Sequence, residues 1–332
     1  MPENRPSGKM FFLITVCILV AAASPFWGLG FISPGVIFTP GHPDAEVFWR
    51  LRLPRMVAAF FSGAALSMSG LVFQALFRNP LATPFTLGVS SGAALGASVY
   101  FWLGAGLSFL GTSGSLAAAL LGGLLSMTLV YLITRAKGGF STPVMLLAGV
   151  IINFFFSSLV MFIQYLSDSH DSMRIMHWLM GSLSGLEMAR LSDLGFVTLA
   201  GAAVIWRMAP EIDLLTAGED LAASRGVNIR RAKIMIFITA SIMVGTVVSL
   251  AGPIGFVGMM VPQVCRLWLG WSHRRLLPAS FFLGGAFLCL CDLAARLVLA
   301  PAEIPIGIVT ALLGGPFFLW TLFRANRVGD VF

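Results

Sequence analysis

Apolar runs long enough to cross a lipid bilayer recur along the whole chain, separated by short polar segments. A hydrocarbon core of about 30 Å requires roughly 20 predominantly apolar residues in one helical segment. Runs of this length predict ten transmembrane helices, over residues 10–32, 56–77, 85–107, 114–134, 143–166, 191–208, 234–251, 254–271, 276–299 and 305–323. The pattern therefore predicts an all-α, polytopic membrane protein in which residues 1–332 form a single transmembrane domain.

The first apolar run has two interpretations. Arg5 and Lys9 precede it and it passes through three alanines at 21–23, which resembles the pattern of a cleavable signal peptide. The apolar character continues to Trp27 and Phe31, beyond the point where such a signal would end. We therefore expect a retained membrane span.

Composition and cysteine usage narrow the class of protein. Hydrophobic residues make up 58% of the chain and charged residues 11%. This composition is more apolar than that of a soluble globular domain of 332 residues. The four cysteines lie inside apolar runs, where a thiol behaves as a small hydrophobe, at Cys17, Cys265, Cys289 and Cys291. We expect neither a disulfide framework nor a metal site. The basic residues are scattered between apolar runs, which indicates orientation in a membrane rather than a nucleic-acid partner.

The distribution of Lys and Arg predicts the orientation. An even number of spans places both termini on one side, and short cytoplasmic segments of membrane proteins are enriched in Lys and Arg. With both termini in the cytoplasm, 15 of the 21 basic residues fall on the cytoplasmic side. The other six lie outside, at Arg50, Arg52, Arg55, Arg174, Arg190 and Arg296. We therefore expect both termini to be cytoplasmic.

A polar segment at residues 211–233 interrupts this apolar chain with four acidic and four basic side chains. Thr216 and Glu219 have the spacing of a capping box, and Gly226 offers a helix stop. The helix between them, from about 217 to 225, would be about 13 Å long and too short to cross a bilayer. In the predicted topology the segment is the longest cytoplasmic loop. It is either a solvated connector or a docking element for a cytoplasmic partner.

The chain carries no motif for powering transport by itself. It lacks the G-x-x-x-x-G-K-[ST] phosphate-binding loop and the H-E-x-x-H zinc motif. Ion-coupled carriers usually place ionisable groups near the bilayer midplane. Asp292 is the clear intramembrane carboxylate, and Arg296, four residues further on a helix, is placed to neutralise it. We expect no catalytic residues, and we expect the energy for any transport to come from another chain.

Six blocks of sequence carry a family resemblance. They begin with LRLPRMVAAFFSGAALSMSGLVFQALFRNPLATPFTLGVSSGAALGA at 51–97. The others are FSTPVMLLAG (140–149), HWLMGSLSG (177–185), GEDLAASRGV (218–227), LAGPIGFVGMMVPQVCR (250–266) and DLAARLVLAPAEIPIGIVTALLGGPFF (292–318). In this order and over nearly the whole chain, they resemble the permease subunits of binding-protein-dependent ABC importers for iron chelates, haem and cobalamin.

The resemblance implies an assembly. A homodimer with ten helices per subunit would lie in the bacterial cytoplasmic (inner) membrane as a multi-pass permease domain. Two separate ATP-binding subunits would dock on its cytoplasmic face, and a periplasmic or lipid-anchored substrate-binding protein on its outer face. No cofactor is implied.

The resemblance also implies functional positions. The cytoplasmic coupling segment, about 209–230, would carry the ATPase contacts at Glu219, Asp220, Ala222, Ala223, Arg225 and Gly226, although the order Asp220-Leu221-Ala222-Ala223 departs from the family pattern. The binding protein would dock at Arg52, Arg55 and Arg296, for which membrane-interface anchoring is the simpler alternative.

The span at 143–166 would face its mate across the twofold axis. Ser141 and Thr142, just before it, match the inner gate of the family, with Pro143 as a departure. Asn153 and Gln164 would face the translocation pathway or form interhelical hydrogen bonds.

The cargo and two other functional classes stay open. An iron chelate (siderophore), haem or cobalamin fits the resemblance, and His170, Met173, Met176 and His177 have side chains that ligate haem iron. A loop histidine and a block typical of the family explain these residues equally well. An ion-coupled secondary transporter would move cargo with an ion gradient and no ATPase, and a membrane enzyme would need a reactive cluster near the bilayer.

Overall fold

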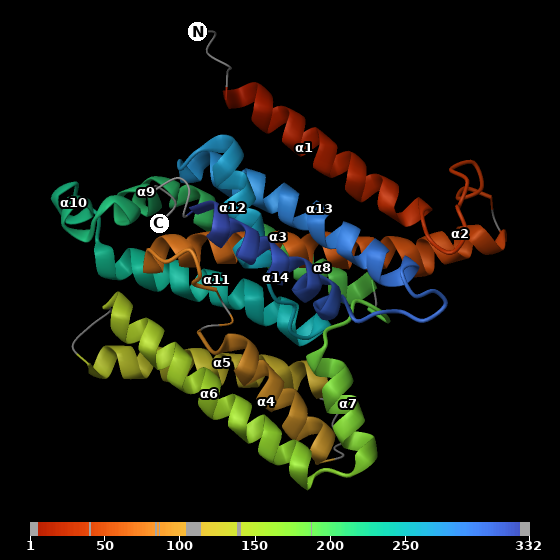
Figure 1. Cartoon of the computed structure of the whole chain (residues 1–332), viewed down its shortest axis with the longest axis horizontal. Helices are drawn as coiled ribbons and strands as arrows, with labels where there is room; N and C mark the ends of the chain where they lie inside the picture. Colours follow the sequence, from red (N-terminus) through yellow and green to blue (C-terminus); the bar gives the residue numbers. More distant parts are fainter. Residues whose placement is uncertain are drawn as a thin grey trace.

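A computed structural model describes residues 6–39, 41–83, 85, 87–103, 114–137, 141–186 and 188–325, and the described residues that form regular structure are all helical (Figure 1). The helices are α1 (Pro6–Ala23), η1 (Ser24–Phe26), α2 (Pro43–Val47), η2 (Phe48–Arg52), α3 (Leu53–Phe77), α4 (Val89–Trp102), α5 (Gly114–Ala136), α6 (Thr142–Leu166), α7 (Ser169–Leu179), α8 (Met188–Arg207), α9 (Ala209–Ala217), α10 (Glu219–Ser224), α11 (Ile229–Ala251), α12 (Val257–Leu269), α13 (His273–Leu297) and α14 (Ile306–Ala325).

Each of the ten predicted apolar runs coincides with a helix, but their lengths differ. Within the described part of the chain, six helices are long and apolar enough to cross a membrane. The bent pair of α8 and α9 provides a seventh, and α12 and α14 are shorter apolar helices. The protein is therefore an all-helical, polytopic membrane protein with about six to nine apolar spans. The expected span at 85–107 is represented by the shorter α4; residues 86 and 104–107 of that span lie outside the described residues. Phe85, Leu87 and Gly88 are in turns before α4, and Gly88 has a φ of +78°.

α3 runs through the centre of the bundle, with α13 beside it and α8, α11 and α12 around it (Figure 1). From Ala58 to Phe77 it is buried almost throughout. Two glycines allow neighbouring backbones to approach it closely, because Gly63 faces Gly284 of α13 and Gly70 faces Gly258 of α12. Small residues at such contacts let helices pack tightly in lipid, where apolar burial supplies little driving force.

Replacing Gly70 with alanine is expected to destabilise this core. The added Cβ would clash with the backbone of Gly258, which moves only if α12 shifts as a whole. Overpacking of this kind costs about 1–3 kcal/mol. The measurement is the melting temperature of the purified protein in detergent. Gly245→Ala on α11 is the matched control, since its Cβ would meet nothing within 4 Å. Equal melting temperatures for the two variants would contradict the close α3–α12 contact.

The helices fall into two groups joined by α11. α4, α5, α6 and α7 form the group at the bottom of Figure 1, and α11 contacts both α4 and α5 on that side and α3 and α8 on the other. α1 lies along α13 and buries Leu13, Cys17 and Ala21.

All four cysteines are buried and free, as expected for thiols used as small apolar side chains.

Two ends of the bundle carry the predicted functional residues. We call them the α10 end, which holds α9, α10 and the first turns of α6 and α11, and the α2 end, which holds α2, η2 and the loop after α13 (Figure 1). The first turn of α1 and the last turn of α14 point toward the α10 end.

Candidate functional site

The polar segment forms the two short helices α9 and α10 at one end of the bundle (Figure 1). α9 leaves α8 at a bend of 57°, and Pro210 lies in its first turn, where an absent N–H breaks no helical hydrogen bond. After α10, Gly226 adopts a φ of +82°, and Val227 N donates to Ala222 O at 3.0 Å. This is the geometry of a helix ended by glycine, so the predicted stop at Gly226 is confirmed.

The predicted capping box is wrong. Thr216 lies inside α9, where its Oγ1 donates to Ile212 O at 2.7 Å. Gly218 occupies the N-cap position of α10, which has no side-chain cap, so the second helix begins two residues later than expected. The chain turns at Gly218 because a residue without a Cβ tolerates its φ of +157°. The Glu219 carboxylate pairs with Lys233 instead of capping a helix.

α10 has an inner side and an outer side. Ala222 is completely buried and packs α10 against the rest of the chain, so direct contact between Ala222 and a partner would require α10 to detach. The predicted contact residues Asp220, Ala223, Arg225 and Gly226 are exposed. Leu221 is 43% exposed beside them and was not singled out from the sequence. The sequence feature that could have identified Leu221 is an apolar residue on a helix that is too short and too polar to cross a membrane.

Two contacts tie α9 to the bundle. Arg78, at the end of α3, donates from Nη2 and Nε to Leu215 O at 2.8 and 3.1 Å. The carbonyls in the last turn of a helix lack partners within that helix, so the guanidinium satisfies one of them. Asp213 Oδ1 accepts from His273 N at 2.9 Å and lies 2.6 Å from His273 Nδ1, at the start of α13. α9 is therefore held to both α3 and α13.

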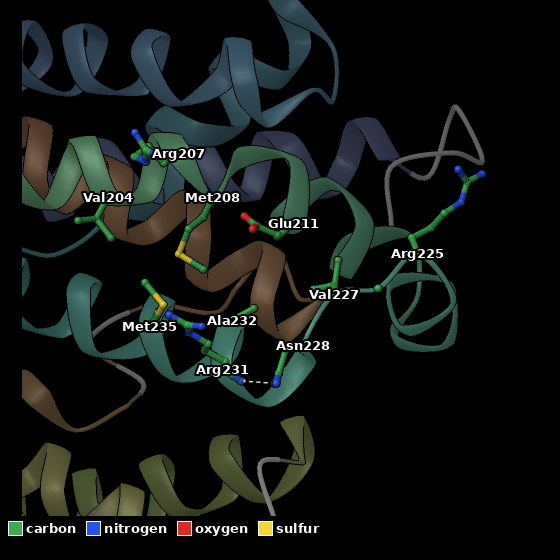
Figure 2. Close-up of a pocket in the computed structure, with 11 residues that line it drawn as sticks. Val204, Arg207, Met208, Glu211, Arg225, Val227, Asn228, Arg231, Ala232 and Met235 are labelled. Carbon is green, nitrogen blue, oxygen red and sulfur yellow. Dashed lines mark hydrogen bonds between the residues drawn. The ribbon is translucent and has the colours of Figure 1, made fainter.

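A groove of about 750 Å³ lies beside α10, between α8 and α9 on one side and α11 on the other (Figure 2). Its lining residues are Val204, Arg207, Met208, Glu211, Arg225, Gly226, Val227, Asn228, Arg231, Ala232 and Met235. Figure 2 shows the Glu211 carboxylate pointing between the two walls and Arg225 pointing away from the groove. Asn228 caps α11 by accepting from Arg231 N at 3.0 Å. The lining of the groove thus includes three arginines, Arg207, Arg225 and Arg231, and one carboxylate, Glu211, so the groove is electropositive.

The two predicted gate residues lie at the start of α6, also at the α10 end. Ser141 is the N-cap residue and its Oγ accepts from Val144 N at 3.4 Å. Thr142 is the first residue of α6, and its Oγ1 accepts from Lys233 Nζ at 3.3 Å. The same Nζ lies 2.9 Å from Glu219 Oε1. Lys233, which sequence reasoning did not select, thus contacts both a predicted gate residue and a predicted coupling residue.

The two polar residues of α6 are half-buried. Asn153 and Gln164 are eleven residues apart, which is close to three full turns, so they lie on one face of the helix. Neither side chain forms a hydrogen bond in the described part of the chain, so the interhelical hydrogen bonds considered from the sequence are absent there. Large apolar side chains of α6 are exposed, among them Phe154, Phe155 and Tyr165.

An ion network lies at the α2 end. Asp292 is 2% exposed and pairs with Arg296 Nε at 3.1 Å, which confirms the predicted pair. Arg55 Nε lies 2.7 Å from Asp292, and Arg55 Nη1 lies 2.8 Å from Glu303. Arg52 donates instead to backbone carbonyls, among them Gly30 O at 2.8 Å. The three predicted docking arginines therefore already bind acceptors within the chain, because a buried carboxylate and the open carbonyls after α1 require donors.

A groove of about 430 Å³ lies beside this network and includes Arg50, Arg52, Arg55, Arg296 and Glu303 among its lining residues. Arg50 is exposed and was not chosen from the sequence as a docking residue, although it is part of the same basic run as Arg52. The lining of this groove carries four arginines against Glu303, with Asp292 buried behind it, while Asp44 and Glu46 of α2 lie at the same end of the bundle.

The residues considered for haem ligation lie on α7 rather than in a loop. Asp168 caps this helix by accepting from Asp171 N at 2.8 Å. Among the described residues, no group of three or more His, Cys, Asp or Glu side chains is placed to hold a metal ion. The positions concerned are His170, Met173, Met176 and His177.

Comparison with known proteins identifies the family. A profile described as the FecCD transport family matches residues 12–324. The vitamin B12 import system permease BtuC of Escherichia coli is 38% identical over 327 residues, 98% of each chain. The hemin transport system permease HmuU of Yersinia pestis is 34% identical over 326 residues, 97% of each chain. A solved structure described as an inward-facing conformation of a metal-chelate type ABC transporter superposes with a TM-score of 0.84 at 31% identity, covering 95% of this chain and 98% of that one.

These matches extend over nearly the whole length of both chains, and the solved structure shares the helical fold. This sequence has no G-x-x-x-x-G-K-[ST] nucleotide-binding motif. The chain therefore belongs to the FecCD transport family and is a multi-pass membrane permease of a bacterial ABC importer, not itself an ATPase.

Proposed function

We propose that two copies of this chain form the translocation pathway for an iron chelate, haem or cobalamin. Two separate ATPase subunits dock at the α10 end, in the cytoplasm, and a substrate-binding protein docks at the α2 end, outside. Each subunit crosses the membrane ten times. The observation that carries the proposal is the coupling segment, a short polar element exposed at one end of an otherwise apolar helical bundle.

The coupling segment has the properties of a mechanical contact. It is too short to span the membrane, and Arg78 and His273 bind α9 to α3 and α13. Its outer side presents Leu221 and Arg225 next to an electropositive groove. An exposed apolar side chain with a charged neighbour is typical of a protein interface, and a rigid base transmits the displacement that a partner imposes.

Three observations support the ten-span topology with cytoplasmic termini. All ten predicted runs coincide with helices. The first turn of α1 and the last turn of α14 point toward the α10 end (Figure 1), as an even number of crossings requires. In this topology the sequence assigns 15 of the 21 basic residues to the cytoplasmic side, in agreement with the enrichment of Lys and Arg there.

The α2 end suits an acidic binding protein. Arg50 is exposed and available for direct contact, and Arg52 donates to neutral backbone carbonyls and so keeps its positive charge. Arg55 and Arg296 are balanced by Asp292 and Glu303 and hold this end in place. Complementary charge of this kind steers association and sets orientation.

The pathway lies along α6. Ser141 and Thr142 form the inner gate, and Asn153 and Gln164 face the passage, since their side chains are partly exposed and lack hydrogen-bond partners in the described part of the chain. The exposed aromatic side chains of α6 pack against the second copy of the chain. The described residues include no cluster of three or more His, Cys, Asp or Glu side chains that could hold a metal ion, which fits selection of the cargo by the binding protein.

Reconstitution tests this function against ion-coupled transport. The permease, its cognate ATPase and its binding protein are placed in proteoliposomes, and uptake of haemin, cobalamin and a ferric siderophore is measured in parallel. We expect uptake of one of them that requires all three proteins and ATP. Uptake driven by a proton or sodium gradient without the ATPase would identify a secondary transporter instead.

A further inference from the structure

Lys233 is a buried cation at the junction of three helices. It lies in the first turns of α11, and its side chain is 3% exposed. Its Nζ binds the carboxylate of Glu219 on α10 at 2.9 Å and the hydroxyl of Thr142 on α6 at 3.3 Å. Ammonium groups are retained in such places only when they are paired and hydrogen-bonded, because desolvation of an unpaired charge is costly.

Thr142 and Glu219, two of the groups that Lys233 contacts, belong to elements that otherwise pack on different neighbours. α10 packs on α9 and α11, whereas α6 packs mainly on α4 and α5. Glu219 is in the first turn of α10, and Thr142 is the first residue of α6. Their shared contact with one ammonium group therefore bridges the coupling segment and the gate helix.

The two contacts of Lys233 differ in strength, so we expect the ammonium group to follow α10 rather than α6. The Glu219 carboxylate is charged, so its contact with Lys233 is stronger than the contact with the neutral Thr142 hydroxyl. Glu219 is 43% exposed and lies on the side of α10 that is accessible from outside the bundle. A displacement of α10 therefore carries the ammonium group with it and withdraws it from the first turn of α6.

We propose that Lys233 is the positioning residue that transmits movement of the coupling segment to the inner gate, through Glu219 on one side and Thr142 on the other. This inference rests on the proposed function, since it requires an ATPase at α10 and a gate at the start of α6. A purely structural ion pair would stabilise the fold and leave the gate's response to the ATPase unchanged.

A reporter at the gate distinguishes these roles without knowledge of the cargo. In Ser141→Cys, labelling by a membrane-impermeant maleimide is compared between the resting complex and the complex trapped with ATP and vanadate. The native cysteines are buried, and labelling of the chain without Ser141→Cys gives the background. We expect trapping of the complex with ATP and vanadate to change the labelling rate of the cysteine introduced by Ser141→Cys. This single variant is the parent for the substitutions that follow.

When Lys233→Met is added to this parent, we expect the change in labelling rate per trapped ATPase to fall by about fivefold or more. A factor of this size corresponds to the usual coupling free energy between two sites. Lys233→Arg, which keeps a cation within reach of both acceptors, should restore a large part of the response. Lys9→Met, at an exposed lysine in the first turn of α1 outside the coupling segment and the gate, is the matched control and should behave as the parent.

Thr142→Val provides an independent test, because it removes the gate contact and leaves the Lys233–Glu219 pair intact. Like Lys233→Met, it should uncouple the gate from trapping, so the inference remains testable if Lys233→Met fails to assemble. A full response in Lys233→Met or in Thr142→Val would overturn the role of Lys233 and leave the proposed function standing. A parent complex that never binds the ATPase would overturn the proposed function itself.

Discussion

Replacing Asp292 with alanine is expected to lower the free energy of unfolding by about 3–5 kcal/mol, the usual cost of removing one partner from a buried ion pair. Asp292 is 2% exposed and is the shared counter-ion of Arg55 and Arg296, at 2.7 and 3.1 Å. Without it, two largely enclosed guanidinium groups lose their common carboxylate. The measurement is unfolding of the purified protein in detergent by titration with a denaturing detergent.

Glu303→Ala is the control for this network. Glu303 also binds Arg55, at 2.8 Å, but is 48% exposed, so water screens its contribution. Exposed ion pairs contribute about 0–1 kcal/mol, and we expect a correspondingly small change. Asp292→Ala with the stability of the parent would show that the network is unnecessary for folding.

A triple variant separates folding from docking. Apolar replacement of a whole buried ion network is often neutral or stabilising, so Asp292→Leu with Arg55→Leu and Arg296→Met should fold with nearly the parent's stability. Its affinity for the binding protein should nevertheless fall, since two of the arginines at the α2 end are gone.

Replacing Gly226 with proline is expected to weaken ATPase binding by about tenfold or more, the effect of losing an interface hot spot. Gly226 has a φ of +82°, which the proline ring excludes, so the link between α10 and α11 must reorganise. The change would displace Leu221 and Arg225 on the outer side of α10. Copurification of the ATPase with the permease, followed by a binding isotherm, measures the loss.

Gly226→Asn is the matched control. An added Cβ at this position meets nothing within 4 Å, so the substitution tests backbone conformation and not steric contact. Asparagine tolerates the left-handed region better than other non-glycine residues, and we expect ATPase binding close to that of the parent. Equal binding by the proline and asparagine variants would show that the conformation of this turn has no part in docking.

Local sequence patterns predicted the helices well. Each of the ten apolar runs coincides with a helix, and six of these helices have the length and apolar character that a bilayer requires. The Asp292–Arg296 pair was predictable because residues four apart share a helix face. The stop at Gly226 followed from the conformational freedom of glycine. The capping box at Thr216 failed because two adjacent short helices left the position of the break between them ambiguous.

By itself, the amino-acid sequence determined the class of the protein, its family, the places of its membrane helices and the segment that protrudes from them. The class, the helices and the polar segment follow from composition, run length and spacings of up to four residues. The family follows instead from the resemblance of six sequence blocks to known permeases. Only the tertiary structure decided that Arg55 shares Asp292 with Arg296, that Ala222 faces inward, and that Lys233 joins Glu219 to Thr142. The contacts of Arg55 and Lys233 join helices that are distant in the sequence, and the inward direction of Ala222 depends on which side of α10 meets the bundle. Both depend on how the helices pack together, which local sequence patterns do not predict.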